Sequence, residues 1–95
     1  MLDIFIQDTP VALGRLRAAI DDGDMRSVVK LTHTLKAACS LFGVPDLVAR
    51  LEAAESAARR SEPGAAALAA AAIPGVECLV DAVRRDRQAD EEKAR

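Results

Sequence analysis

Apolar residues recur three and four positions apart along most of the chain, and this spacing predicts five helical segments. The segments cover roughly residues 2–8, 10–21, 24–42, 45–60 and 64–88. Thr9 and Pro10 separate the first two, because threonine caps helix N-termini and proline is favoured at the first helical position. Gly43 ends the third segment, and Pro45 starts the fourth two residues later.

Further start and stop signals complete this division. Asp24 can cap the third segment, and the Ser-Glu-Pro-Gly stretch at residues 61–64 separates the last two. Pro74 is expected to kink or divide the final segment, because proline lacks a backbone donor. Short connections favour antiparallel neighbours, so the chain is predicted to be an all-α, up-and-down bundle. We expect one domain over residues 1–90 and a charged, frayed tail over residues 91–95.

Composition narrows the classes of function. Hydrophobic residues make up 51% of the chain and aromatic residues only 2%, so alanine supplies much of the apolar content and helices can approach closely. A net charge of −2 and the scarcity of aromatic rings argue against nucleic-acid binding. Cys39 and Cys78 are too few for a disulfide framework, which favours a cytoplasmic environment. The longest apolar run, residues 65–73, is too short to cross a bilayer of about 30 Å, so no membrane partner is expected.

The third segment carries His33, the only histidine in the chain. On a helical wheel it points away from the apolar face, which consists of Val28, Leu31, Leu35, Ala38, Cys39 and Phe42. Three basic residues lie within about a quarter-turn of its direction, namely Arg26, Lys30 and Lys36. Ala37 and Ser40 are small and lie nearly in line with His33, and Val29 is an apolar residue on this otherwise polar face.

This arrangement suits an imidazole that meets another protein. A neutral imidazole nitrogen is nucleophilic near neutral pH, and small neighbours leave room for a partner. The nearby cations would attract an anionic partner and stabilise a phosphoryl group on the ring, and Val29 offers an apolar contact for docking. The residues alone leave open that His33 is an ordinary solvated histidine among cations that only promote solubility.

The chain has His-Thr-Leu-Lys at residues 33–36, then Ala37, and then Gly43 six residues after that alanine. This pattern resembles the signature of the histidine-phosphotransfer (HPt) domain family. Leu-Glu at residues 51–52 falls where that family commonly has a Leu-Glu pair in its next helix. The resemblance extends over roughly residues 2–55. One departure is Ala37, where the family most often has glycine, and its methyl group could influence the choice of partner.

The resemblance implies a four-helix bundle with a short accessory N-terminal helix and a phosphoryl group carried on His33. It also implies that Lys36 helps to neutralise that group and that Gly43 closes the helix bearing the histidine. The implied partners are response-regulator receiver domains and a sensor or hybrid histidine kinase. No cofactor is expected on this chain, because Mg²⁺ belongs to the receiver. We therefore expect a monomeric, cytoplasmic carrier in a multistep two-component phosphorelay, without kinase activity of its own.

Three other interpretations remain open. An interaction module of the same fold would bind a receiver or kinase through this face without transferring phosphate. A histidine-kinase dimerisation domain also presents a histidine on a helix, but there an acidic residue usually follows, whereas here Thr34 does. A generic helical domain with a coincidental motif ranks last, because motif, wheel position and helix order agree.

Overall fold

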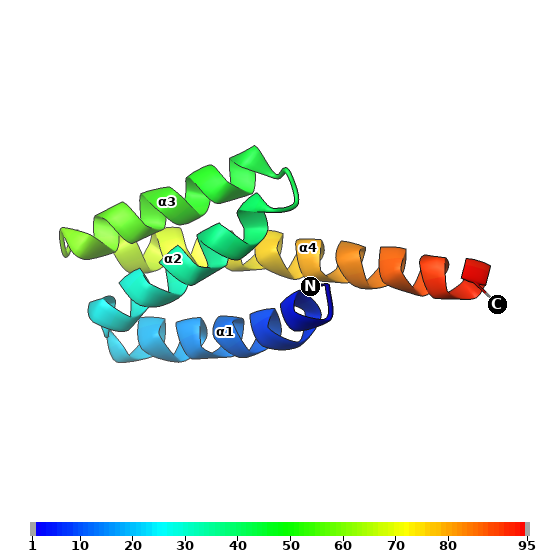
Figure 1. Cartoon of the computed structure of the whole chain (residues 1–95). Helices are drawn as coiled ribbons and strands as arrows, with labels where there is room; N and C mark the ends of the chain where they lie inside the picture. The colour runs from blue at the N-terminus through cyan, green and yellow to red at the C-terminus, as the bar shows by residue number, and fades with distance from the viewer. Residues whose placement is uncertain (1, 95) are drawn as a thin grey trace.

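The computed structural model describes residues 2–94, which form four helices: α1 (Leu2–Asp22), α2 (Met25–Ser40), α3 (Pro45–Arg59) and α4 (Ala65–Ala94). Figure 1 shows successive helices running in alternate directions. α2 and α4 each pack against all three other helices, whereas α1 and α3 make no contact within the described residues. The all-α prediction is confirmed, and the molecule is elongated, with extents of 51 × 23 × 18 Å.

The first two predicted segments form a single helix, α1, which runs through Pro10. Buried positions continue at helical spacing across this proline, at Phe5, Thr9, Leu13 and Leu16. Pro10 itself lies on the exposed face of α1. The short accessory N-terminal helix is therefore not a separate element, and that prediction was wrong.

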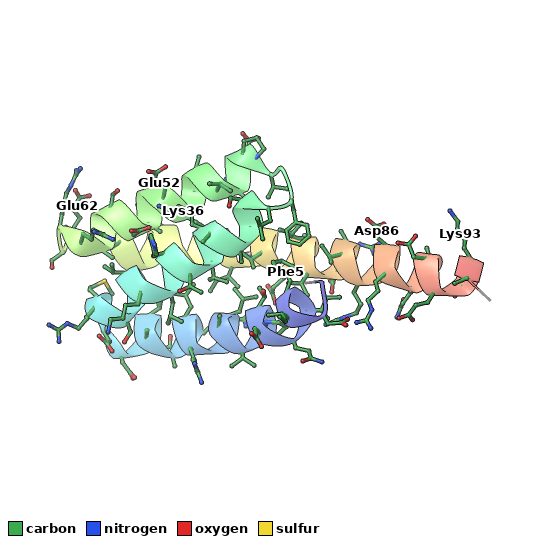
Figure 2. All side chains as sticks on the ribbon, viewed as in Figure 1. Phe5, Lys36, Glu52, Glu62, Asp86 and Lys93 are labelled. Atoms are coloured by element: carbon green, nitrogen blue, oxygen red, sulfur yellow. The ribbon has the colours of Figure 1, made fainter. Side chains whose placement is uncertain are left out.

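Packing around Phe5, near the start of α1, explains why Thr9-Pro10 does not interrupt this helix. Phe5 lies in a small apolar cluster with Val80 and Val83 of α4, and its ring centroid lies 4.5 Å from that of Phe42 (Figure 2). Burying one large apolar side chain contributes about 1.5–3 kcal/mol, which is comparable to the cost of about 3 kcal/mol for an interior proline. Tertiary packing thus offsets the local preference for a break.

α4 also continues through its proline, Pro74, and is not divided there. Its buried positions keep helical spacing on both sides of the proline, as at Ile73 and Val76. The helix ends at Ala94 rather than near residue 88, and its last turns project beyond the bundle (Figure 1). Residues 88–94 are exposed, and the fraying of the tail stays a prediction.

Small residues allow α3 and α4 to approach closely. Ala54, Ala65 and Ala69 are completely buried. A Cβ atom on Gly75 would lie 2.8 Å from Cδ1 of Leu47, so this position requires a residue without a side chain unless Leu47 moves. Alanine and glycine therefore set the spacing of these helices, as the composition suggested.

The alanine content also gives α4 the length and composition of a helix that could cross a membrane, with a mean hydropathy of 1.7 over 18 residues. The uninterrupted apolar run had suggested that no segment is long enough, but α4 continues past Pro74 and is longer than that run. In the bundle, 33% of this stretch is buried, and its buried alanines pack in the main core. The buried third of this stretch thus belongs to the core of the bundle.

Candidate functional site

α2 begins at a capped turn and presents His33 on its outer face. The Asp24 carboxylate accepts hydrogen bonds from the Ser27 backbone nitrogen at 3.2 Å and from the Ser27 hydroxyl at 2.6 Å, as expected of an N-cap. The buried face of α2 consists of Val28, Thr32, Leu35 and Cys39. On the opposite face, the His33 side chain is 59% exposed. The structure therefore places the imidazole where another protein can reach it.

The His33 ring contacts a carboxylate from the neighbouring helix, that of Glu55 in α3. Nδ1 lies 3.2 Å from Oε2 and 3.3 Å from Oε1 of Glu55, a residue that is only 5% exposed. Two cations share the same carboxylate: Lys36 Nζ lies 3.1 Å from Oε1, and Arg59 Nη2 lies 2.6 Å from Oε2. Glu55 thus joins α2 to α3 and holds three polar groups around one buried charge.

Glu55 is ionised at neutral pH although it is buried. Burial raises the pKa of this carboxyl, but hydrogen bonds from Lys36, Arg59 and His33 lower it, and the resulting pKa lies below the ordinary value of 4.5. An ionised carboxylate can only accept hydrogen bonds, so Nδ1 of His33 carries the proton and donates it. This tautomer leaves the lone pair on Nε2, on the side of the ring away from Nδ1. The site therefore holds one nucleophilic nitrogen on an exposed, oriented ring.

Lys36 is half-buried between the two helices. Its side chain is 24% exposed, and its ammonium group pairs with the Glu55 carboxylate. Figure 2 shows Lys36 on the side of α2 that faces α3. Because Lys36 follows His33 by three residues, the two side chains share one face of α2 and reach the same carboxylate.

The residues predicted to surround His33 have different environments. Arg26 and Lys30 are exposed, and neither forms an ion pair within residues 2–94. Ala37 and Ser40 are also exposed, and the Ser40 hydroxyl donates a hydrogen bond of 2.7 Å to the Ala37 carbonyl. Gly43 lies in the turn after α2 with φ of +65°, a conformation that favours glycine.

Val29 is not the exposed apolar contact that the wheel indicated. It is half-buried and packs against the main core. On the wheel Val29 and Lys36 lie on the same side of His33, which is the side that α3 covers. A wheel of one helix cannot show how widely a neighbouring helix covers it, and this explains the error.

Glu55 and Arg59 were not predicted as site residues. A signal was present, because Glu55 follows the buried Leu51 by four residues and so falls on the apolar face of α3. A carboxylate on such a face requires polar partners, and Arg59 is one turn away. Glu52, from the Leu-Glu pair compared with the family, is exposed on the outer side of α3 (Figure 2).

The arrangement provides an exposed nucleophile next to fixed positive charge, which suits transfer of an anionic group. Among residues 2–94, no cluster of three or more His, Cys, Asp or Glu side chains could hold a metal ion.

Comparison with known proteins identifies the family. The family model described as "Hpt domain" matches residues 1–89 of the 95-residue chain. No curated protein and no solved structure matches the chain significantly. Hpt domains are helical bundles that serve as histidine-phosphotransfer modules in two-component signalling, acting with receiver domains and histidine kinases. The match covers α1, α2, α3 and α4 as far as residue 89, and it includes the site around His33. The chain therefore belongs to the Hpt domain family.

Proposed function

We propose that this chain carries a phosphoryl group on Nε2 of His33 between receiver-domain aspartates in a multistep phosphorelay. The observation that carries this proposal is the exposed imidazole whose Nδ1 lies 3.2 Å from the buried Glu55 carboxylate. Lys36 supplies a cation at the same carboxylate. An oriented nucleophile beside positive charge is what phosphoryl transfer needs, because this reaction depends mainly on positioning and electrostatic stabilisation.

In the proposed step, the lone pair of Nε2 attacks the phosphorus of a receiver's aspartyl phosphate in line with the bond that breaks. The N–P bond forms, the P–O bond to the aspartate breaks, and the carboxylate leaves with the bonding electrons. The ring gains positive charge, which the Glu55 carboxylate stabilises through the Nδ1 proton. Lys36 offsets charge on the phosphoryl oxygens. The reverse step passes the group to the next aspartate.

The remaining parts of the reaction are assigned to the partner. We propose that the receiver supplies Mg²⁺ and the other catalytic groups, so that this chain is a carrier without kinase activity. Ala37 and Ser40 leave an open surface along α2 for docking, and Arg26 and Lys30 favour an acidic partner. We further propose that the protein acts as a monomer in the cytoplasm, where sensor or hybrid histidine kinases present their receivers.

A phosphotransfer assay tests this function. Purified protein is mixed with a panel of phosphorylated receiver domains, and the product is examined for an acid-labile, base-stable label. We expect label on the wild-type chain and none on His33→Gln, which should keep wild-type helicity because His33 is 59% exposed. Label on the variant would show that the phosphorylated residue has been misidentified.

The same assay separates the main alternative, an interaction module that binds a receiver or kinase without transferring phosphate. Absence of label with every receiver, together with measurable binding to one of them, would favour that alternative. Autophosphorylation with ATP and no partner would contradict the assignment as a carrier.

A further inference from the structure

Arg59 lies next to the His33–Glu55 pair, but it has no role in the transfer step proposed above. It occupies the last turn of α3, one turn after Glu55. Its Nη2 atom lies 2.6 Å from Oε2 of Glu55, the oxygen that lies 3.2 Å from Nδ1 of His33. The guanidinium is therefore no further from the imidazole than these two distances together. Its side chain is 60% exposed, so it can change direction without disturbing the core.

The charges around His33 leave room for an added anion. α2 contributes Lys36 and α3 contributes Glu55 and Arg59, so two cations face one carboxylate next to the ring. A phosphoryl group on a side chain brings a charge of about −1.5 to −2. Of the two cations that pair with Glu55, Lys36 would have to serve both that group and the carboxylate if Arg59 did not contribute. A second cation within reach would complete the neutralisation.

The two cations lie on opposite sides of the His33–Glu55 pair. Lys36 is one turn after His33 on α2, and Arg59 is one turn after Glu55 on α3. Because α2 and α3 run in opposite directions, these two turns extend toward opposite ends of the bundle (Figure 1). A phosphoryl group on the ring would thus have one cation on each side along the helix axes.

We propose that Arg59 binds the phosphoryl group on His33 as a second cation opposite Lys36, an inference that rests on the proposed phosphorylation of His33. A guanidinium has five donors in a planar fork, so Arg59 can keep one hydrogen bond to Glu55 while another donor reaches a phosphoryl oxygen. This contact stabilises the phosphorylated form of the carrier. It forms only after transfer, and it favours the dianionic phosphoryl group.

A chemical phosphorylation tests this assignment without any receiver. Phosphoramidate serves as the probe: Nε2 displaces ammonia as the P–N bond of the reagent breaks and the new N–P bond forms. Since the chain has one histidine, the product gives a single phosphohistidine signal in ³¹P NMR. Wild type is compared with Arg59→Ala, Arg59→Lys and the control Arg60→Ala. Arg60 is the adjacent cation at the end of α3, where its Nη1 lies 3.4 Å from Glu62.

The measurements are the pH titration of the phosphoryl signal and the hydrolysis rate of phospho-His33. In Arg59→Ala we expect the second ionisation at higher pH and its equilibrium shifted about three- to tenfold, because a cation favouring the dianion is lost. Arg59→Lys should recover part of the effect, and Arg60→Ala should match wild type. Identical titrations and hydrolysis rates for Arg59→Ala and Arg60→Ala would overturn the proposal.

A measurement on the unphosphorylated protein distinguishes phosphoryl binding from a role in which Arg59 acts on His33 only by positioning Glu55. The ¹⁵N shifts of His33 report its tautomer, and Arg59→Ala should leave them as in wild type. A change of tautomer in that variant would mean that Arg59 only positions Glu55, and would refute phosphoryl binding. If wild type accepts phosphate from phosphoramidate but from no receiver, the phosphorelay function fails, while the titration still decides the role of Arg59.

Discussion

Glu55 is a charged side chain in a position where charge is costly, since only 5% of the residue is exposed. An ion taken out of water loses several kcal/mol of hydration unless partners replace it. Here His33, Lys36 and Arg59 supply those partners, and each contributes to the lowering of the Glu55 pKa. The carboxylate thus couples the orientation of the imidazole to the packing of α2 against α3.

The ionisation of Glu55 predicts a pH dependence of stability. Because its pKa in the folded protein lies below 4.5, the ionised group stabilises the fold above about pH 4.5, and this contribution is lost as the pH falls through the lowered value. Glu55→Gln should lose this dependence. The free energy of unfolding is measured by urea titration at several pH values from about 3 to 7.

Glu52→Gln is the matched control for that measurement. Glu52 lies on the same helix but is exposed, so its variant should keep the wild-type slope of stability against pH. If Glu55→Gln also keeps the wild-type slope, the ion-paired carboxylate is not a source of acid lability, and the account of its pKa is refuted.

At the scale of helices, small side chains decide how closely α4 approaches its neighbours. Ala65 and Ala69 are completely buried in the main core. The Leu47 side chain packs so close to Gly75 that a Cβ atom at that position would clash with it. Alanine buries little apolar area per residue, so the stability of these contacts depends on the short distance between backbones. Such a helix tolerates little added volume on its buried face.

A volume increase in α4 tests this dependence. Ala69→Leu should lower the free energy of unfolding by about 1–3 kcal/mol, because added methylenes overpack a site that is 0% exposed. Ala70→Leu, on the exposed face of the same turn, should change stability by no more than about 0.5 kcal/mol. Both substitutions keep a strong helix former, so their helix propensities match. Equal losses in chemical denaturation would argue against close packing at Ala69.

For the whole molecule, the end of the bundle is held by residues far apart in the sequence. Phe5 of α1 packs with Val80 and Val83 of α4, and the side chains of residues 88–94 are exposed. Near its end α4 carries surface ion pairs: Arg87 pairs with Asp3 of α1, and its Nε lies 3.2 Å from Oε1 of Glu91 in α4 itself. Exposed pairs of this kind contribute about 0–1 kcal/mol.

Truncation tests where the folded unit ends. Removal of residues 91–95 should change the melting temperature by less than about 4 °C, because the side chains of residues 91–94 are exposed. A chain that ends at residue 79 should melt at least about 8 °C lower, since it lacks Val80 and Val83 of the Phe5 cluster. A large loss from the shorter truncation would place residues 91–95 within the cooperative domain.

The sequence by itself determined the helical class, the breaks near Gly23, Gly43 and residues 61–64, and the exposure of His33. These features follow from local chemistry: glycine adopts positive φ, as Gly23 and Gly43 do, and side chains repeat every 3.6 residues along a helix. The HPt resemblance also came from residues close together in the chain, and the family match confirms it.

Only the tertiary structure decided the continuity of α1 through Pro10 and of α4 through Pro74, because burial on both sides of each proline outweighs its local preference. It also brought Glu55 to His33 from 22 residues away, and with it Lys36 and Arg59. A pattern within one helix shows which side chains share a face. The packing of two helices decides which neighbouring helix covers that face and which charged side chain the neighbour brings to it.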